Sequence, residues 1–203
     1  LGLPVANISD MMARMTAGGA RLRPMHGGGN MAGPALTVKT RPGDNLMVHK
    51  ALNIAEPGDV VVVDAGGDLT NAIIGELMLR FAMERKLGGV VIDGAVRDSG
   101  FIRANSFPVY AAGVTHRGPY KDGPGEINVP IALDGMVIEP GDLIVGDEDG
   151  LLCIPFDQVD ALYAATREKF DGEQAMIAQI KAGTSNRAQW DKRVLDLGCE
   201  IEA

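Results

Sequence analysis

The stretch Val90-Val91-Ile92-Asp93-Gly94-Ala95-Val96-Arg97-Asp98 decides the fold class of this chain. Its first residues are apolar at consecutive positions, a pattern typical of a β-strand that is covered on both faces. Residues 71–86 before it have helical periodicity, which the Gly88-Gly89 pair ends, and residues 99–104 after it predict one or two helical turns. A buried strand between helices indicates an α/β protein.

A repeated turn surrounds this strand. Pro-Gly-Asp occurs at residues 42–44, 57–59 and 140–142. Pro followed by Gly suits the two central positions of a type II turn, because Pro presets φ and Gly accepts a positive φ. The second and third copies precede the apolar runs 60–64 and 143–147, which we also interpret as strands covered on two faces.

Further elements are predicted on both sides. Helices are expected at residues 8–15, 46–55 and 156–181, strands at 35–39 and 109–112, and short strands at 127–133, 136–138, 143–145 and 151–154. Residues 113–125 are polar and rich in Gly and Pro, which predicts a surface loop. No linker interrupts the pattern, so we expect one α/β domain over residues 1–203 with a mixed central sheet.

Composition narrows the classes of function. The net charge of −8 argues against a nucleic-acid binder, which needs a Lys/Arg stripe to neutralise phosphates. No apolar run approaches membrane-spanning length, and no signal peptide is visible at the start. Cys153 and Cys199 lack metal-ligand spacing and are interpreted as reduced thiols, so a cytoplasmic location is expected.

The first candidate site is the segment 64–78, where a strand ends, a Gly-rich loop follows and a helix begins. Free N–H groups and the positive end of the helix dipole suit such a place to an anion, and Gly75 allows close approach of a ligand. The alternative is that the glycines only turn the chain. The GxGxxG and GxxxxGK[ST] patterns are absent, so dinucleotide and nucleoside triphosphate binding lose support.

The second candidate is the pair Arg97 and Asp98 at the end of the apolar strand. Ligands of α/β sheets usually bind at strand ends. Arg97 offers a planar fork for a carboxylate, and Asp98 offers a hard oxygen ligand for Mg²⁺ or Mn²⁺. On the residues alone, the simpler alternative is a local ion pair, or an Asp that caps the helix at Ser99.

Four segments together resemble one family. They are Gly75-Glu-Leu-Met, Val91-Ile-Asp-Gly-Ala-Val-Arg-Asp, Gly123-Pro-Gly-Glu-Ile-Asn-Val-Pro, and Pro140-Gly-Asp followed by Gly146-Asp-Glu-Asp-Gly. In this order and spacing they resemble the RraA-like family, which includes 4-hydroxy-4-methyl-2-oxoglutarate aldolases. The likeness covers a core of about residues 9–155, and residues 156–203 form a C-terminal helix and tail.

The resemblance implies a class II aldolase that depends on a divalent metal cation, Mg²⁺ or Mn²⁺. Such an enzyme releases pyruvate from 4-hydroxy-4-methyl-2-oxoglutarate or a related 4-hydroxy-2-oxo acid and also decarboxylates oxaloacetate. The implied fold is a swivelling β/β/α-type sandwich, and the implied assembly is a homotrimer or a dimer of trimers with sites between subunits.

The resemblance also implies residue roles. Backbone donors to the substrate would come from Gly75, Glu76, Leu77 and Met78, Arg97 would bind its carboxylate and oxo end, and Asp98 would hold the metal. Glu76 stands where the enzymes more often have Asp, and it is the first choice for the group that takes the proton from the substrate hydroxyl.

Two further positions bear on the resemblance. Phe101 stands near the Arg-Asp pair where the aldolases usually have a carboxylate, which leaves the choice of substrate open. The enzymes also take a Glu from the C-terminal region of a neighbouring subunit, for which Glu173 is the candidate here. The tail after residue 181 is expected to pack on such a neighbour.

The other polar residues give weaker signals. His26, His49 and His116 have no mutual spacing that suggests a metal site, and His49 is interpreted as structural on its amphipathic helix. His116 and Arg117 are candidates to face a second anionic group of the substrate. No Lys stands in an apolar strand as a Schiff-base candidate, which favours metal chemistry over imine chemistry.

Two functions from different classes follow from the resemblance. One is the aldolase, and the other is a non-catalytic RraA-type protein that binds and inhibits ribonuclease E. A methyltransferase is not expected, because the chain lacks a Gly-rich S-adenosylmethionine loop followed by an acidic strand end.

Overall fold

Strand β5 (Gly89–Val96) lies in the middle of a mixed sheet, and every one of its residues is buried. The computed structural model describes residues 2–14 and 19–199. Within them the sheet has nine strands, with the order β1-β6-β5-β3-β2-β10-β11, while β4 pairs with β5 and β7 pairs with β2. The bounds are β1 Arg23–Pro24, β2 Met31–Thr40, β3 Val60–Asp64, β4 Ala72–Ile74, β6 Val109–Val114, β7 Gly125–Ile127, β10 Leu143–Asp147 and β11 Gly150–Ile154.

The sheet is parallel at its centre and antiparallel at its edges. Strands β2, β3, β5 and β6 pair in parallel, with Val61 opposite Val90 and Val90 opposite Val109. The β10–β11 hairpin and the short strands β1 and β7 pair antiparallel. The predicted α/β class with a mixed central sheet is therefore confirmed.

Consecutive valines of β3 pack on opposite faces of the sheet. Val61 and Val63 belong to the core on the side of α2 (Leu46–Ile54), α3 (Glu76–Glu84) and α4 (Ser99–Arg103). Val60 and Val62 belong to a second core under the β8–β9 hairpin (Ile131–Leu133 and Met136–Ile138). The two-residue period of a strand explains why an unbroken apolar run was required here.

One predicted element is wrong at its start. Residues 71–86 were expected to form a single helix, but Ala72–Ile74 is strand β4, and α3 begins only at Glu76. Ala72 pairs with Ala95 and Ile74 with Val96 of β5, and all of β4 is buried. Pairing with β5 therefore overrides the helical periodicity of these residues.

Smaller differences concern boundaries. The first helix, α1, spans Val5–Met11 rather than 8–15, and residues 15–18 lie outside the described part. The predicted strand 127–133 divides into β7 and β8, and the predicted terminal helix begins as the 3₁₀ turn η1 (Phe156–Gln158) before α5 (Val159–Lys181). Helix α6 (Ala188–Asp196) was not predicted.

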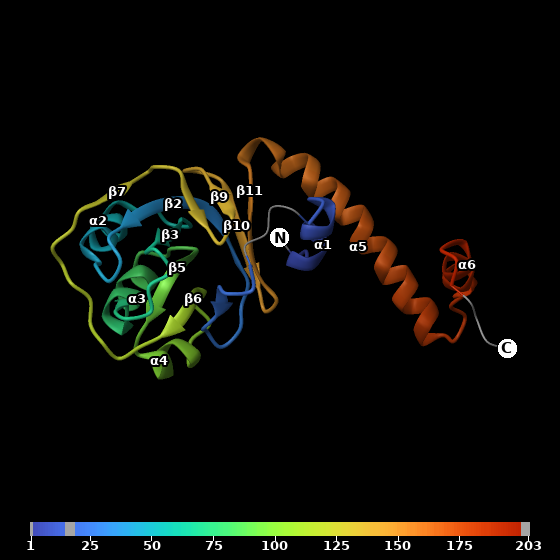
Figure 1. Ribbon diagram of the computed structural model, residues 1–203, viewed down its shortest axis with the longest axis horizontal. Coiled ribbons are helices and arrows are strands. Elements are labelled where there is room, and N and C mark those ends of the chain that lie inside the picture. The colour runs from blue at the N-terminus through green and yellow to red at the C-terminus, as the bar shows by residue number, and fades with distance from the viewer. Residues whose placement is uncertain (1, 15–18, 200–203) are drawn as a thin grey trace.

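Helix α5 leaves the sheet and ends far from it, with α6 beyond its end (Figure 1). Its first half packs with α1 and the β10–β11 hairpin in a third apolar cluster. Its second half exposes Met176, Ile177 and Ile180, and α6 exposes Trp190. Among residues 2–14 and 19–199, none of the helices combines the length and apolar character needed to cross a bilayer.

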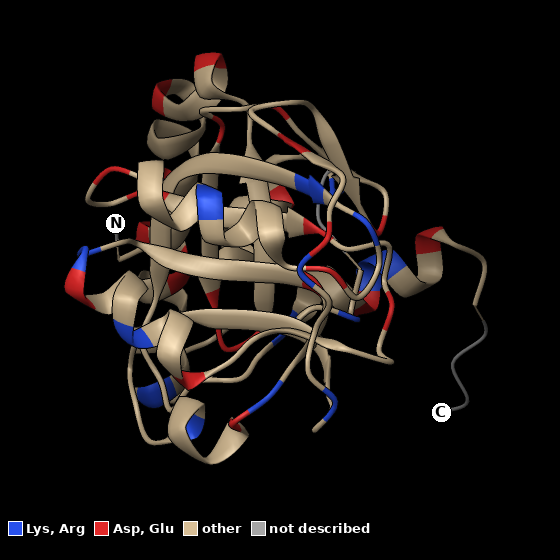
Figure 2. Cartoon of the chain, turned by 90° about the vertical axis from the view of Figure 1, so that its left-hand side faces the viewer, with Lys and Arg blue, Asp and Glu red and all other residues tan. Residues whose placement is uncertain are grey.

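Acidic and basic residues are interspersed along the elements seen in Figure 2. This distribution agrees with the negative net charge and offers no long basic stripe in that view.

Candidate active site

The start of α3 lies directly against the end of β5. Gly75 occupies the cap position with extended backbone, φ −149°. A Cβ atom on Gly75 would collide with the Asp98 carboxylate and would come within 2.9 Å of Arg97 Cγ. Glycine is therefore required at this position, because it lets the chain pass close to the Arg97–Asp98 pair.

Asp98 joins the two segments. Its Oδ2 accepts a hydrogen bond of 2.8 Å from the backbone N–H of Glu76, so the carboxylate caps α3. It also lies 3.8 Å from Arg97 Nε, so the local ion pair considered from the sequence is present. Asp98 itself holds φ 57°, a left-handed conformation that Asp tolerates better than most residues, and makes no side-chain cap bond to α4.

The pair faces a cavity of about 430 Å³ at the carboxyl ends of β4 and β5. The arginine and aspartate side chains are 43% and 42% exposed, so both are accessible to a ligand. The structure brings the residues of both candidate segments together on the wall of this cavity: Gly75, Glu76, Leu77, Met78, Arg97 and Asp98. This location is where ligands of α/β sheets usually bind.

Glu76 makes a second contact that the sequence did not indicate. Its Oε1 lies 2.8 Å from both Nε and Nη2 of Arg80, one helical turn later. The Arg80 guanidinium in turn lies 4.6 Å from the centre of the Phe101 ring. Phe101 thus contacts the arginine that pairs with Glu76.

Three polar residues that line the cavity were missed as site residues: Asn45, His49 and Lys121. Asn45 precedes α2, and His49 lies one turn further along that helix. Burial, and then the charge of Lys121, lower the pKa of His49, so its imidazole is neutral at pH 7. The available signal was the spacing of four residues between Asn45, directly before α2, and His49 within it.

The loop that carries Lys121 is attached to the chain before α2. The buried carboxylate of Asp44 accepts hydrogen bonds from the backbone N–H groups of Leu46, Asp122 and Gly123, at 2.9, 2.7 and 3.0 Å. Burial alone would raise the pKa of Asp44, but these donors and the charge of Arg41 outweigh it and lower the pKa. Asp44 therefore fixes the loop that carries Lys121 against the start of α2.

Three other residues singled out from the sequence lie outside the lining of this cavity. His116 and Arg117 are not among its lining residues, and the Arg117 carbonyl instead accepts a hydrogen bond from Ala72 N–H at 2.8 Å. Glu173, the candidate for a neighbouring site, accepts hydrogen bonds of 2.6 Å from both Asn7 and Lys169. In its own chain Glu173 thus joins α5 to α1.

The donor set suits a hard cation held by few protein ligands. No group of three or more His, Cys, Asp and Glu side chains arranged for a metal occurs in residues 2–14 and 19–199. Asp98 accepts the Glu76 N–H through Oδ2, so its other oxygen, Oδ1, is the one that would bind a cation or a water. Mg²⁺ typically binds through one or two carboxylates and keeps several waters, which fits this site.

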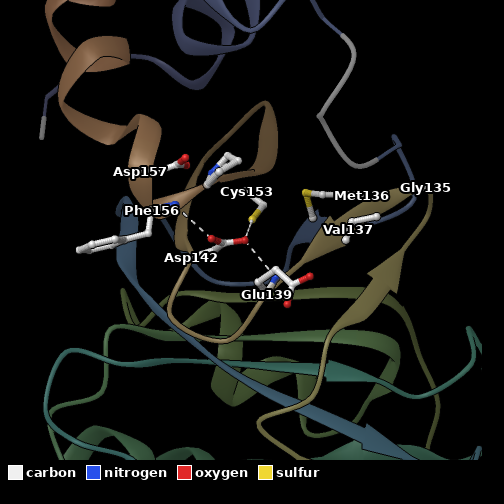
Figure 3. A pocket seen from close by; sticks show the side chains of 9 residues that line it. Gly135, Met136, Val137, Glu139, Asp142, Cys153, Phe156 and Asp157 are labelled. Carbon is white, nitrogen blue, oxygen red and sulfur yellow. Dashed lines mark hydrogen bonds between the residues drawn. The ribbon is translucent and has the colours of Figure 1, made fainter.

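A larger cavity, of about 530 Å³, lies beside β9 and β11 (Figure 3). Its central carboxylate, Asp142, accepts hydrogen bonds from Glu139 N–H at 3.0 Å, Phe156 N–H at 3.1 Å and the Cys153 thiol at 3.5 Å. Burial, followed by the charge of Asp142, raises the pKa of Cys153, so the thiol stays protonated. The Asp142 carboxylate is therefore used in hydrogen bonds within the fold, and the thiol beside it is not activated as a nucleophile.

Comparison with known proteins gives a consistent result. Residues 5–153 match the RraA-like family, described as Aldolase/RraA. A Halalkalibacterium halodurans protein named "Putative 4-hydroxy-4-methyl-2-oxoglutarate aldolase" is 41% identical over 85% of this chain and 82% of its own length.

Two solved structures are also similar. The RNA-processing inhibitor RraA from Thermus thermophilus is 33% identical, with a TM-score of 0.70 over 76% of this chain and 94% of that chain. A Geobacillus kaustophilus structure titled S-adenosylmethionine:2-dimethylmenaquinone methyltransferase is 31% identical, with a TM-score of 0.72 over 78% and 98% of the two chains.

Proposed function

Because this chain belongs to the RraA-like family, we propose that it is a carbon–carbon lyase that releases pyruvate from 4-hydroxy-4-methyl-2-oxoglutarate or a related 4-hydroxy-2-oxo acid. We also propose that the same site decarboxylates oxaloacetate. The observation that carries the proposal is the contact of Gly75 and Glu76 with the Arg97–Asp98 pair on one cavity wall.

Both reactions need the same stabilisation. Each breaks a bond at C3 of a 2-oxo acid and leaves the enolate of pyruvate, so negative charge develops on the oxo oxygen. Arg97 is suited to bind the carboxylate and this oxygen through its planar fork. The N–H groups of Leu77 and Met78, in the first turn of α3, have no partner within that helix, and in this proposal they donate to the same anion.

Asp98 is the residue that would hold Mg²⁺ or Mn²⁺ in this proposal. When bound, the cation supplies Lewis-acid stabilisation of the enolate charge. In an aldol cleavage the C4 hydroxyl must lose its proton, and Glu76 is the proposed acceptor. Both contacts from Arg80 fall on Oε1, which leaves Oε2 for that proton or for a water.

The experiment is pyruvate release from oxaloacetate and from 4-hydroxy-4-methyl-2-oxoglutarate, with Mg²⁺ or with a chelator. Arg97→Ala and Asp98→Ala are compared with Arg103→Ala, a matched control for an exposed basic residue on α4. We expect both site variants to lose at least about 100-fold in rate, by analogy with the loss of an oxyanion donor. Equal rates for all these proteins would reject the proposal.

We also propose a homotrimer, or a dimer of trimers, in the cytoplasm. The apolar side chains exposed on the second half of α5 and on α6 support an interface between copies. Light scattering on the purified chain would distinguish these assemblies from a monomer.

A second candidate function rests on the name of one relative. The similar Thermus thermophilus structure is described as an RNA-processing inhibitor, so a non-catalytic protein that binds ribonuclease E is the alternative. The negative net charge suits a basic partner surface. Binding to ribonuclease E, together with no metal-dependent pyruvate release, would favour this alternative.

A further inference from the structure

The side chain of Arg80 holds Glu76 from outside the candidate active site. Glu76 lines the cavity at the ends of β4 and β5 and its side chain is 39% exposed, whereas Arg80 is not among the lining residues. Nε and Nη2 of Arg80 both lie 2.8 Å from the same oxygen, Glu76 Oε1. Arg80 therefore fixes one oxygen of the carboxylate and leaves Oε2 outside the pair.

Arg80 has a second partner that restricts its own freedom. Exposed ion pairs one helical turn apart usually contribute little, because two long side chains lose freedom to form them. Here the Arg80 guanidinium also lies 4.6 Å from the centre of the Phe101 ring, and Arg over an aromatic face is an attractive contact. Phe101 is half-buried and packs against the core on the side of α2, α3 and α4. The core fixes the ring, the ring restricts the guanidinium, and the guanidinium fixes the Glu76 carboxylate.

Both ends of this arrangement return to Asp98. The Asp98 carboxylate accepts the Glu76 backbone N–H at 2.8 Å, and the Asp98 carbonyl accepts the Phe101 N–H at 2.9 Å. Glu76 is thus connected to the segment of Asp98 twice, once through its backbone and once through its side chain. The second connection bears on where the carboxylate lies, because the first already holds the backbone.

We propose that Arg80 and Phe101 are positioning residues for aldol cleavage, which orient the Glu76 carboxylate so that its free oxygen meets the C4 hydroxyl of the substrate. This inference rests on the proposed lyase function. It separates the two reactions proposed for the site, because aldol cleavage needs the oriented carboxylate and decarboxylation does not.

The two reactions differ in one proton. In aldol cleavage the C3–C4 bond breaks, its electron pair forms the enolate, the C4 hydroxyl gives its proton to Glu76, and C4–O becomes a carbonyl. In oxaloacetate decarboxylation the same bond breaks and the same enolate forms, but C4 leaves as CO₂ and no hydroxyl loses a proton. Protonation at C3 then gives pyruvate in both. A displaced carboxylate should therefore slow aldol cleavage more than decarboxylation.

The test is the ratio of two rates measured on one preparation with Mg²⁺: pyruvate release from 4-hydroxy-4-methyl-2-oxoglutarate and from oxaloacetate. Arg80→Met removes both donors and keeps a long side chain. It should lower the rate of aldol cleavage at least about tenfold more than the rate of decarboxylation, since a base displaced by about 1 Å loses much of its effect. The loss should appear in kcat, with KM for the aldol substrate within about twofold of wild type.

Graded variants and a control locate the effect. Arg80→Lys keeps the charge but has a single nitrogen, so it should recover part of the ratio that Arg80→Met loses. Phe101→Leu removes the ring and should lower the ratio about threefold. Arg103→Met, at an exposed Arg on α4, is the control and should keep the wild-type ratio. Equal losses of both reactions in Arg80→Met would show a structural role and overturn the proposal.

Glu76→Gln tests whether Arg80 acts through the carboxylate. This variant should lower the ratio about 100-fold, and adding Arg80→Met to it should change the ratio by less than about twofold. A further tenfold fall in the double variant would overturn the proposal, because Arg80 would then act by another route.

Failure of the lyase function would be recognised separately, because the wild-type protein would then release no pyruvate from either acid. An active wild-type protein whose ratio is the same in Arg80→Met would keep the lyase function and overturn the positioning role.

Discussion

The two larger polar cavities of this protein differ in what their polar groups are doing. The cavity at the ends of β4 and β5 has an accessible Arg97–Asp98 pair. The cavity beside β9 and β11 is larger, at about 530 against 430 Å³, but Asp142 at its centre accepts three hydrogen bonds from its own surroundings.

The volume of a cavity therefore does not identify the reactive site of this protein. Asp142 joins the turn before β10 to η1 and the end of β9, so its hydrogen bonds stabilise the fold. The Arg97–Asp98 pair instead presents charge to solvent at a strand end.

The largest effect is expected at the first cavity. Arg97→Ala should lower the rate of pyruvate release by about 100- to 1,000-fold, or about 3 to 4 kcal/mol of transition-state stabilisation, because the developing enolate loses its positive partner. The midpoint of thermal unfolding should barely change, since the side chain is 43% exposed. Steady-state kinetics and a melting curve on the same sample measure both.

Gly75→Ala tests the close approach of α3 to the pair. The new Cβ would displace the Asp98 carboxylate and press on Arg97, so we expect pyruvate release to fall by at least about tenfold. Gly100→Ala is the matched control, because a Cβ there meets no atom within 4 Å. An active Gly75→Ala protein would contradict the contact between these segments.

Asp142→Ala should lower stability and leave the rate unchanged, the opposite of what is expected for Arg97→Ala. Removing the carboxylate leaves the N–H groups of Glu139 and Phe156 without their acceptor, which costs about 2 kcal/mol in the free energy of unfolding. For a chain of this size that is a fall of about 4 to 8 °C in the unfolding midpoint. The rate per folded molecule should stay unchanged, and Asp157→Ala at the exposed rim is the control.

Acid should lower the free energy of unfolding in two steps, through His49 and Asp44 beside the first cavity. The folded-state pKa of His49 lies below 6.5, so the unfolded chain binds the proton first, and the free energy of unfolding falls as the pH drops below that value. The pKa of Asp44 is also lowered, so its stabilisation is complete above the unfolded value of 3.8 and is lost as the pH falls through the folded value.

Denaturant titrations from pH 8 to pH 3 would measure both steps. His49→Gln should remove the pH dependence that begins near 6.5 and leave the more acidic step. An unchanged upper step in that variant would show that His49 is not its source.

The smallest effect concerns the thiols. Cys153 is buried and its raised pKa keeps it protonated at neutral pH, whereas Cys199 is exposed. A disulfide reagent at pH 7.5 should therefore label Cys199 quickly and Cys153 only after unfolding. Cys199→Ser should remove the fast reaction, and fast labelling of that variant would contradict the burial of Cys153.

The sequence was most informative where chemistry and structure lie in one short segment. Arg97 and Asp98 follow a buried strand directly, so their place at its carboxyl end was predictable. The presence of Asn45 and Lys121 on the same cavity was not predictable. It depends on contacts between distant parts of the chain, such as the hydrogen bond from Asp122 N–H to Asp44, which joins residues 78 apart. Local patterns carry no information on such a pairing.

The prediction of a helix at the residues of β4 was wrong for a related reason. Ile73 and Ile74 fit the apolar face of a helix that continues into α3, and only the available edge of β5 makes them a strand. The capping of α3 by Asp98 was likewise hidden, because the sequence suggests a cap for the adjacent helix, whereas the carboxylate reaches Glu76, 22 residues earlier.

The most direct test of the account is where an enolate mimic binds. Oxalate resembles the planar enolate of pyruvate, and its binding in the presence of Mg²⁺ can be measured by calorimetry without any turnover. We expect wild type and Asp142→Ala to bind oxalate alike, and Arg97→Ala to bind it at least about tenfold more weakly. Undiminished binding to Arg97→Ala, or loss of binding in a folded Asp142→Ala protein, would contradict it.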